Sequence, residues 1–273
     1  MPDAFLITRG HERKHDYDFC GPVPSELWWS PLSQLQLVDL NQADAIAYGD
    51  GRSLHVLVSG IPSARSDFLG RSIRHTLVVE NVHEDVPLAC RIVLAGLRED
   101  DRQALGRRLD EVFTEEAIVA LRTSAEDAEF MRRLLRPILS GGWEAETADT
   151  SSLPADAGRS WAGPIGDERA RAKFLSRVQR LGNGGAGFAF TSSLLRTREQ
   201  VEADSKSLPG ITAVLLADGE LDEVVPLGKA LPAVPDQQGR LTAWVPARPP
   251  TIAAAGAAAA LLIAILIVLL IMI

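Results

Sequence analysis

The sequence predicts an α/β (or α+β) cytoplasmic region followed by a single C-terminal transmembrane helix. Three observations predict this organisation. Short β-branched runs alternate with segments of helical periodicity over the first 231 residues, a proline-rich stretch follows, and the last 23 of the 273 residues carry no charge. The composition excludes collagen-like, disulfide-framework and wholly disordered proteins, because 46% of the residues are hydrophobic and only two, Cys20 and Cys90, are cysteines.

Residues 1–139 are expected to form an N-terminal α/β domain. Two segments with apolar residues on one helical face follow its strands, one starting at Leu105 and one from Ala128 to Ile138, where Pro137 is expected to close the run. Four short apolar runs predict strands, at Ala4–Thr8, Leu54–Ser59, Thr76–Val82 and Cys90–Ala95.

A stretch rich in small and polar residues, 140–166, predicts a loop or a domain boundary. A second α/β block is expected over 167–231, either as a separate domain or as part of the first. Within it, the helix-like Thr197–Lys206 lies between the strand-like Gly187–Thr191 and Ile211–Ala217, which is typical of a β-α-β unit. The five prolines of 232–250 predict a semi-extended linker.

Residues 251–273 are expected to span a membrane once. A helix of this length reaches about 34 Å, and the hydrocarbon core of a bilayer is about 30 Å thick. Arg240 and Arg248 precede the span and no charge follows it, so the positive-inside rule predicts a tail anchor with the N-terminal region in the cytoplasm. In that reducing compartment both cysteines are expected to be free thiols.

Two further features are related to the bilayer. A stripe of small residues, Gly256, Ala260 and Ala264, would let two tails pack together, so a homo-oligomer is one expectation. A basic helix is predicted to lie on anionic lipid or an acidic partner, and the alternative is an ordinary solvated surface. Its basic residues are Arg169, Arg171, Lys173, Arg177 and Arg180.

The pattern His-Glu-x-x-His occurs at His11, Glu12 and His15, the arrangement with which zinc proteases hold their metal. Its surroundings are charged and carry no apolar helical stripe, so a charged loop is the favoured interpretation and a zinc hydrolase the alternative. No P-loop lysine motif, nucleophile elbow or Cys-x-x-Cys pair is present. We therefore assign no catalytic residue, metal or cofactor.

The segment Gly60–Val79 places five ionisable residues between two strand-like runs, where we expect them to cluster at one end of a sheet and bind a partner. They are Arg65, Asp67, Arg71, Arg74 and His75. The alternative is a salt-bridged loop in which the arginines pair with Asp67 and no ligand binds. The stretch Asp67-Phe68-Leu69-Gly70-Arg71, followed by His75-Thr76-Leu77-Val78, resembles the N-terminal module of bacterial GTPase-associated adaptor proteins of conflict systems. The resemblance covers about 20 residues. It implies a non-enzymatic module that couples a nucleotide-dependent partner, with a GTPase as the candidate, to an effector or to the membrane.

The first functional hypothesis is a protein-binding adaptor or regulator, tail-anchored in a bacterial inner membrane. Arginine outnumbers lysine by 24 to 4, which suggests GC-rich bacterial coding, and the net charge of −8 argues against a nucleic-acid partner. The alternative is a membrane-disrupting effector that oligomerises through its tail.

Overall fold

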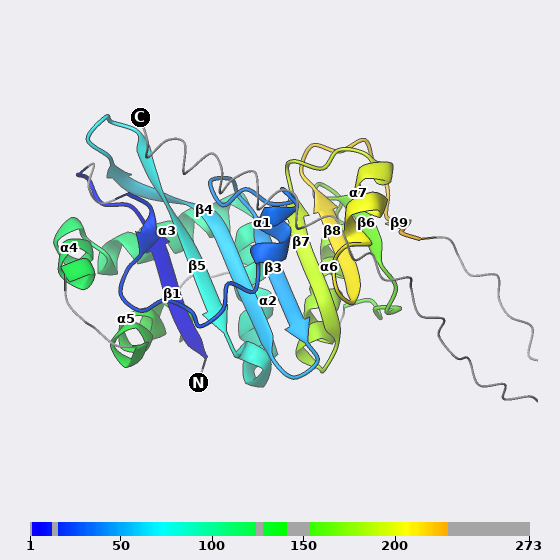
Figure 1. Ribbon diagram of the computed structural model, residues 1–273, viewed down its shortest axis with the longest axis horizontal. Helices are drawn as coiled ribbons and strands as arrows, with labels where there is room; N and C mark the ends of the chain where they lie inside the picture. The colour runs from blue at the N-terminus through cyan, green and yellow to red at the C-terminus, as the bar shows by residue number, and fades with distance from the viewer. Residues whose placement is uncertain (1, 13–15, 124–127, 141–152, 229–273) are drawn as a thin grey trace, which may run out of the picture. The chain divides into compact units, whose positions relative to one another are not determined.

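The computed structural model describes residues 2–12, 16–123, 128–140 and 153–228 (Figure 1). These residues belong to one compact unit, Met1–Lys229, and the second unit, Ala230–Ile273, lies outside them. The predicted linker, the predicted membrane span and its stripe of Gly256, Ala260 and Ala264 therefore fall outside the described residues. Within the described ranges, no helix combines the length and apolarity needed to cross a membrane.

The described chain is a mixed α/β fold built on one large sheet, which confirms the α/β part of the predicted fold class. The strand order is β2-β1-β5-β4-β3-β7-β8-β6-β9. The strands are β1 (Asp3–Thr8), β2 (Asp18–Phe19), β3 (Ala45–Asp50), β4 (Leu54–Ser66), β5 (Ser72–Glu80), β6 (Trp161–Pro164), β7 (Ala186–Ser192), β8 (Ile211–Leu216) and β9 (Val225–Pro226).

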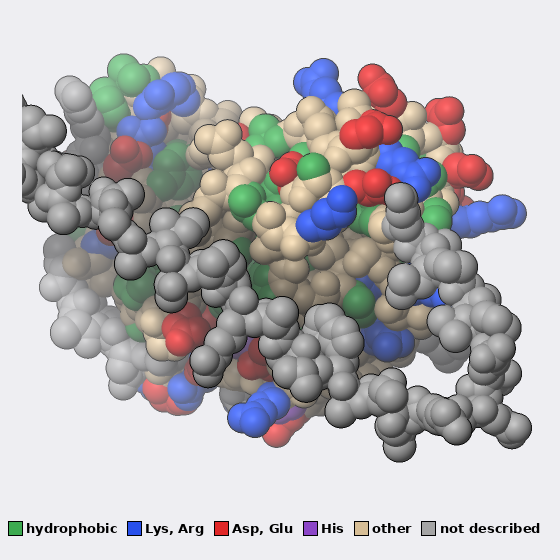
Figure 2. All heavy atoms as spheres, turned by 45° about the vertical axis from the view of Figure 1, so that its right-hand side comes forward, with side chains coloured by type: hydrophobic (Ala, Val, Ile, Leu, Met, Phe, Trp, Pro, Cys, Tyr) green, Lys and Arg blue, Asp and Glu red, His purple; other side chains and the backbone are tan. Residues whose placement is uncertain are grey.

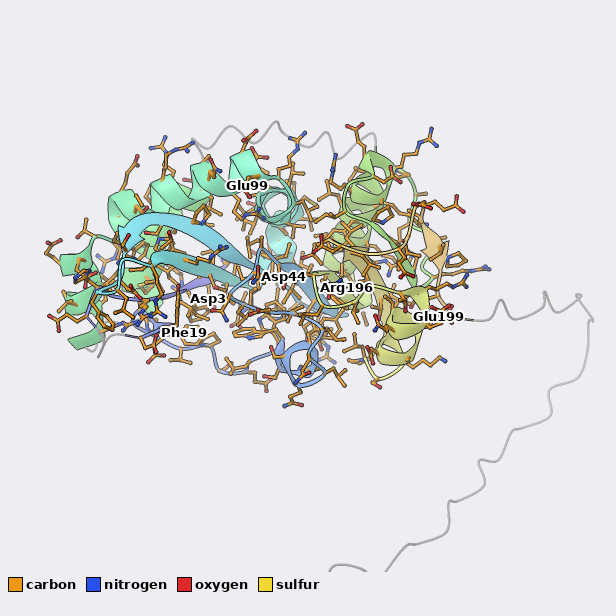
Figure 3. All side chains as sticks on the ribbon, turned by 90° about the horizontal axis from the view of Figure 1, so that it is seen from above. Asp3, Phe19, Asp44, Glu99, Arg196 and Glu199 are labelled. Atoms are coloured by element: carbon orange, nitrogen blue, oxygen red, sulfur yellow. The ribbon has the colours of Figure 1, made fainter. Side chains whose placement is uncertain are left out.

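Helices pack on both faces of this sheet. One core joins helices α2, α3, α5 and α6 to one face, through side chains such as Ala47, Val56 and Val79. The second core lies on the opposite face, where Leu32 of α1 and Val201 of α7 cover the sheet, and Figure 3 shows both layers from above. The helices are η1 (Val82–Asp85, 3₁₀), α1 (Ser30–Gln34), α2 (Val86–Leu97), α3 (Glu99–Val112), α4 (Glu115–Thr123), α5 (Ala128–Ser140), α6 (Glu168–Gly182) and α7 (Arg198–Ser205).

The predicted β-α-β unit is confirmed. Strands β7 and β8 are parallel, and α7 connects them. The sequence starts α7 where Thr197 and Gln200 form a capping box, each side chain accepting a hydrogen bond from the backbone of the other. Strand β7 also pairs with β3, so the second block continues the sheet of the first.

The predicted strand Cys90–Ala95 is wrong, because these residues lie in helix α2. The helix begins after Asp85, whose carboxylate accepts a hydrogen bond from the Leu88 backbone N–H at 3.0 Å. Cys90, Ile92, Val93 and Ala95 are all fully buried. A helix that is buried on nearly every side has no apolar periodicity, so its apolar run resembles a buried strand.

Other differences are smaller. Strand β3 was not predicted, and strand β6 lies inside the stretch predicted as a loop or boundary. Helix α5 continues past Pro137 to Ser140.

The prediction of free thiols is confirmed, since Cys20 and Cys90 are both buried and unpaired. Burial raises the pKa of the Cys90 thiol to about 12.

Candidate functional site

The candidate site is the outer half of the hairpin formed by β4 and β5. Strand β1 pairs with β5 only from Thr76 onward, and β3 pairs with β4 only as far as Val58. Beyond those points the two arms pair with each other alone, out to Ser66 and Ser72. The hairpin therefore extends past its neighbours in the sheet, as Figure 1 shows at its upper left.

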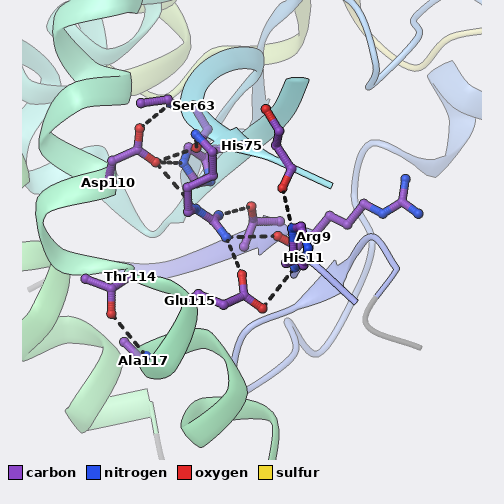
Figure 4. A network of polar contacts seen from close by, with 12 residues as sticks. Arg9, His11, Ser63, His75, Asp110, Thr114, Glu115 and Ala117 are labelled. Carbon is purple, nitrogen blue, oxygen red and sulfur yellow. Dashed lines mark hydrogen bonds and ion pairs between the residues drawn. The ribbon is translucent and has the colours of Figure 1, made fainter. Parts of the chain in front are cut away.

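Asp110 of α3 connects the two arms of the hairpin (Figure 4). Its carboxylate accepts hydrogen bonds from Ser63 Oγ at 2.5 Å and from the Ala64 backbone N–H at 2.6 Å, both on β4. On β5, His75 Nε2 lies 3.0 Å from the same carboxylate. We call Ser63, Arg65, His75 and Asp110 the hairpin base.

The ionisation of the base follows from these contacts. Burial opposes ionisation of Asp110, but hydrogen bonds from His75, Ser63 and Ala64 hold the pKa of its carboxyl below the usual value. Burial lowers the pKa of His75, whose side chain is fully buried, although the contact with Asp110 opposes that shift. His75 is therefore neutral near pH 7, and its Nε2–H donates to a charged carboxylate.

Arg65 ties the base to β1 and α4. Its guanidinium donates to the Arg9 carbonyl oxygen at 3.1 Å and to Thr8 Oγ1 at 3.2 Å, and it forms an ion pair with Glu115 at 3.2 Å. Glu115 also accepts a hydrogen bond from the His11 backbone N–H at 2.9 Å. Most donors of a half-buried guanidinium are thus used inside the molecule.

Asp67 organises the turn at the end of the hairpin. Its carboxylate accepts hydrogen bonds from the backbone N–H groups of Leu69 and Arg71, both at 2.9 Å, and from the Arg71 side chain at 2.8 Å. Arg9 adds an ion pair at 3.0 Å. Burial opposes ionisation of Asp67, but the hydrogen bonds from Arg71 and Leu69 lower its pKa to about 2. Asp67 is therefore ionised at all ordinary pH values.

The side chains that project from this turn are exposed. Phe68 is 42% exposed and Leu69 is 62% exposed, while the Arg71 side chain is 60% exposed. Tyr17, 41% exposed, lies next to the turn, because its hydroxyl accepts a hydrogen bond from the Arg74 backbone N–H at 3.0 Å. We call this surface the hairpin tip, and its residues are Tyr17, Phe68, Leu69, Arg71 and Arg74.

The structure separates the five predicted partner-binding residues into two groups. Arg71 and Arg74 are exposed. Asp67 and His75 are buried, and Arg65 is half-buried and engaged within the network. The side chains of Asp67 and His75 face inward and hold the hairpin in place, which agrees with the alternative of a salt-bridged loop for these two residues.

Sequence reasoning missed Phe68, Leu69 and Tyr17 as surface residues. The signal for the first two was present, since two large apolar residues stand between Asp67 and Gly70 in a turn that is otherwise polar. Apolar side chains in a surface turn have no hydrophobic core within reach against which to pack.

Ser63, His75 and Asp110 do not form a catalytic triad. In a triad the histidine bonds to the nucleophile, and the carboxylate orients the histidine from the other side. Here the carboxylate lies in the middle and accepts from both Ser63 and His75, and the imidazole is fully buried. The arrangement is structural.

The zinc-protease pattern is only partly described, because His15 lies outside the described residues. His11 and Glu12 lie in a bend rather than a helix, and His11 Nδ1 is 2.9 Å from the Ser66 carbonyl oxygen. Among the residues that the structure describes, no three His, Cys, Asp or Glu side chains are grouped as metal ligands.

The basic helix α6 does not present all five of its predicted surface residues. The prediction is wrong for Arg177, which is fully buried and forms an ion pair with Asp156 at 2.6 Å. Arg171 donates to the Ile165 carbonyl oxygen, and the Lys173 ammonium lies 5.1 Å from the centre of the Trp161 ring. Arg169 and Arg180 remain exposed. On the face shown in Figure 2, acidic and basic side chains are interspersed where they are visible.

Comparison of the chain with known protein families, curated proteins and solved structures finds no match. The candidate site is therefore defined by its own geometry.

Proposed function

We propose that the chain is a protein-binding adaptor, tail-anchored in a bacterial inner membrane, and that the hairpin tip is its docking surface. The observation that carries the proposal is the exposure of two adjacent apolar side chains, Phe68 at 42% and Leu69 at 62%. Both lie on a turn that the hydrogen bonds of the Asp67 carboxylate hold in place. Neighbouring apolar side chains in contact with water are typical of a surface that a partner covers.

The network under the tip supports docking by a pre-formed surface. The Arg9 guanidinium lies 5.9 Å from the centre of the Phe68 ring and 6.0 Å from that of Tyr17, and it also pairs with Asp67. These contacts fix the rings before a partner arrives, so less conformational entropy is lost on binding.

The charges of the tip define the partner surface that would fit it. Arg71 and Arg74 flank the apolar side chains, although the protein carries a net charge of −8. We infer a partner with an apolar groove bordered by carboxylates. The resemblance of Asp67–Arg71 to GTPase-associated adaptors favours a GTPase as that partner, and the apolar tail of 251–273 would bring it to the bilayer.

The proposal is tested by affinity capture of the full chain from membranes in mild detergent, followed by identification of the bound proteins. We expect a stoichiometric partner that is lost with Leu69→Asp and with Arg74→Glu. The matched control is Val23→Asp, because Val23 is 60% exposed, nearly the same as Leu69, and lies in another part of the chain. A partner that survives Leu69→Asp, or that Val23→Asp removes equally, would refute docking at the tip.

A further inference from the structure

A cavity of about 310 Å³ lies between the start of β1, the first turns of α2 and the end of α5. Three arginines line it: Arg91, Arg132 and Arg136. Its volume is at the lower end of the range for small-molecule sites, about 300–1,000 Å³. The cavity is separate from the hairpin, so it has no part in the proposed docking surface.

The three arginines differ in their pairing. Arg132 forms an ion pair with Asp3 at 2.7 Å and another with Glu129. Arg91 and Arg136 have no ion-pair partner within the described ranges, and the Nε of Arg91 is buried without a hydrogen bond there. A desolvated guanidinium nitrogen without an acceptor is costly, so the site favours an incoming anion.

Asp85, the acidic residue in the lining, forms no ion pair with these arginines among the described residues. Asp85 caps α2, where its carboxylate accepts a hydrogen bond from the Leu88 backbone N–H at 3.0 Å. A second cavity, of about 470 Å³ beside α6, shows the contrast, because its Arg180 and Asp156 lie 3.9 Å from each other. Of these two cavities, the smaller one thus contains arginines, Arg91 and Arg136, that have no ion-pair partner within the described ranges.

The rest of the lining is largely apolar. Ala4, Leu88 and Leu139 are buried side chains at its wall. A guanidinium offers parallel N–H donors that match the two oxygens of a carboxylate or phosphate group. Next to such a group, the apolar wall would accept hydrocarbon.

We propose that this cavity binds a small amphipathic oxyanion, a carboxylate or phosphate monoester with a short apolar chain. The anionic group bonds to Arg91 and Arg136, and the chain packs on Ala4, Leu88 and Leu139. Arg132, already paired with Asp3, positions the wall of the site.

The test is equilibrium dialysis of the purified full chain in mild detergent against radiolabelled hexanoate, with detergent alone as the blank. We expect saturable binding of about one equivalent. Arg91→Gln should weaken it at least tenfold, and Arg136→Gln should also weaken it. The matched control is Arg133→Gln on the same helix, which should stay within twofold, because Arg133 lies over the Phe130 ring and does not line the cavity.

Competition identifies the chemistry. Unlabelled hexyl phosphate should displace hexanoate, whereas hexan-1-ol and inorganic phosphate at matched ionic strength should not. Displacement by hexan-1-ol would show a purely apolar site, and equal displacement by inorganic phosphate would show that the apolar wall is unused; either result overturns the proposal. Unchanged affinity in Arg91→Gln, or no saturable binding by the wild type, overturns it as well. Thermal melting of each variant checks the fold, and Arg136→Gln, an exposed position on α5, provides the test if Arg91→Gln does not fold.

Discussion

The base and the tip of one hairpin use similar residues for opposite purposes. At the base, His75 is fully buried and Arg65 is half-buried. His75 Nε2 contacts the Asp110 carboxylate, and the Arg65 guanidinium forms an ion pair with Glu115. At the tip, Arg71 is 60% exposed on its side chain and lies beside Leu69, which is exposed although it is apolar. Most side chains of a charged motif can thus belong to the scaffold, while the apolar residues inside it, Phe68 and Leu69, stay exposed.

We therefore expect substitutions at the hairpin base to lower the stability of the fold, and substitutions at the hairpin tip to alter partner binding alone. The largest effect is expected for Asp110→Ala. This change leaves Ser63 Oγ, the Ala64 N–H and His75 Nε2 without their acceptor, and we expect the free energy of unfolding to fall by about 3–5 kcal/mol.

Urea denaturation of the full chain in detergent measures this change. The control is Glu111→Ala, next in sequence, whose exposed carboxylate pairs with Arg108 at 3.0 Å on the helix surface. It should cost less than about 0.5 kcal/mol. Equal losses in the two variants would show that Asp110 does not hold the hairpin.

A second prediction contrasts Asp110, which is partly buried, with Asp44, which is buried. Burial raises the pKa of Asp44 to about 6, although hydrogen bonds from the Asp39 N–H and Thr191 oppose the shift. Because the pKa of Asp44 is higher in the folded state than in the unfolded state, its protonated carboxyl contributes to the free energy of unfolding. This contribution is fully present below pH 3.8 and is lost as the pH rises through about 6. At about 1.4 kcal/mol per unit, the loss is about 3 kcal/mol.

The wild type should therefore lose about 2.5 kcal/mol relative to Asp44→Asn between pH 4 and pH 7.5. Denaturation curves of both proteins across this range give the difference, in which the other titrating groups cancel. A difference that does not change with pH would mean that Asp44 ionises without cost, and the contrast with Asp110 would disappear.

A third prediction concerns the packing contact between the hairpin and helix α3. A Cβ on Gly106 would lie 2.0 Å from the Pro62 carbonyl oxygen of β4, so the helix and the hairpin can approach this closely only with glycine there. Gly106→Ala should lower stability by about 1–3 kcal/mol. We expect amide hydrogen exchange in Gly106→Ala to be accelerated, relative to the wild type, more in β4 and β5 than in β7 and β8. Equal acceleration in all four strands would show that the destabilisation is not local to the hairpin.

The smallest effect on stability is expected at the tip. Leu69→Asp removes no buried contact, so the free energy of unfolding should stay within about 0.5 kcal/mol of the wild type. Thermal melting checks this value. A loss similar to that of Asp110→Ala would show that the tip belongs to the scaffold.

Much of the fold was predictable because periodicity reports which side of an element is buried. β1, β4, β5, β7, β8 and the helix α7 follow directly from their patterns. The sequence failed at Cys90–Ala95, where burial on nearly every side removes the helical period. The cap at Asp85, with Pro87 in the first turn, was the local signal for the helix.

The candidate site was predictable in position but not in detail. The segment 60–79 indicated a polar cluster at one end of a sheet, and the hairpin lies there. Whether His75 and Asp67 point inward depends on Asp110 and Arg9, which lie 35 and 58 positions away along the chain. Pairings of this kind come from packing, so one sequence does not reveal them.

The most direct test of the central claim places a photo-crosslinking phenylalanine analogue at position 69 of the full chain in cells, and at position 23 as the control. We expect a partner protein to be crosslinked in high yield from position 69 and not from position 23. Equal yields at both positions, or no protein crosslinked from position 69 in a stably folded chain, would contradict it.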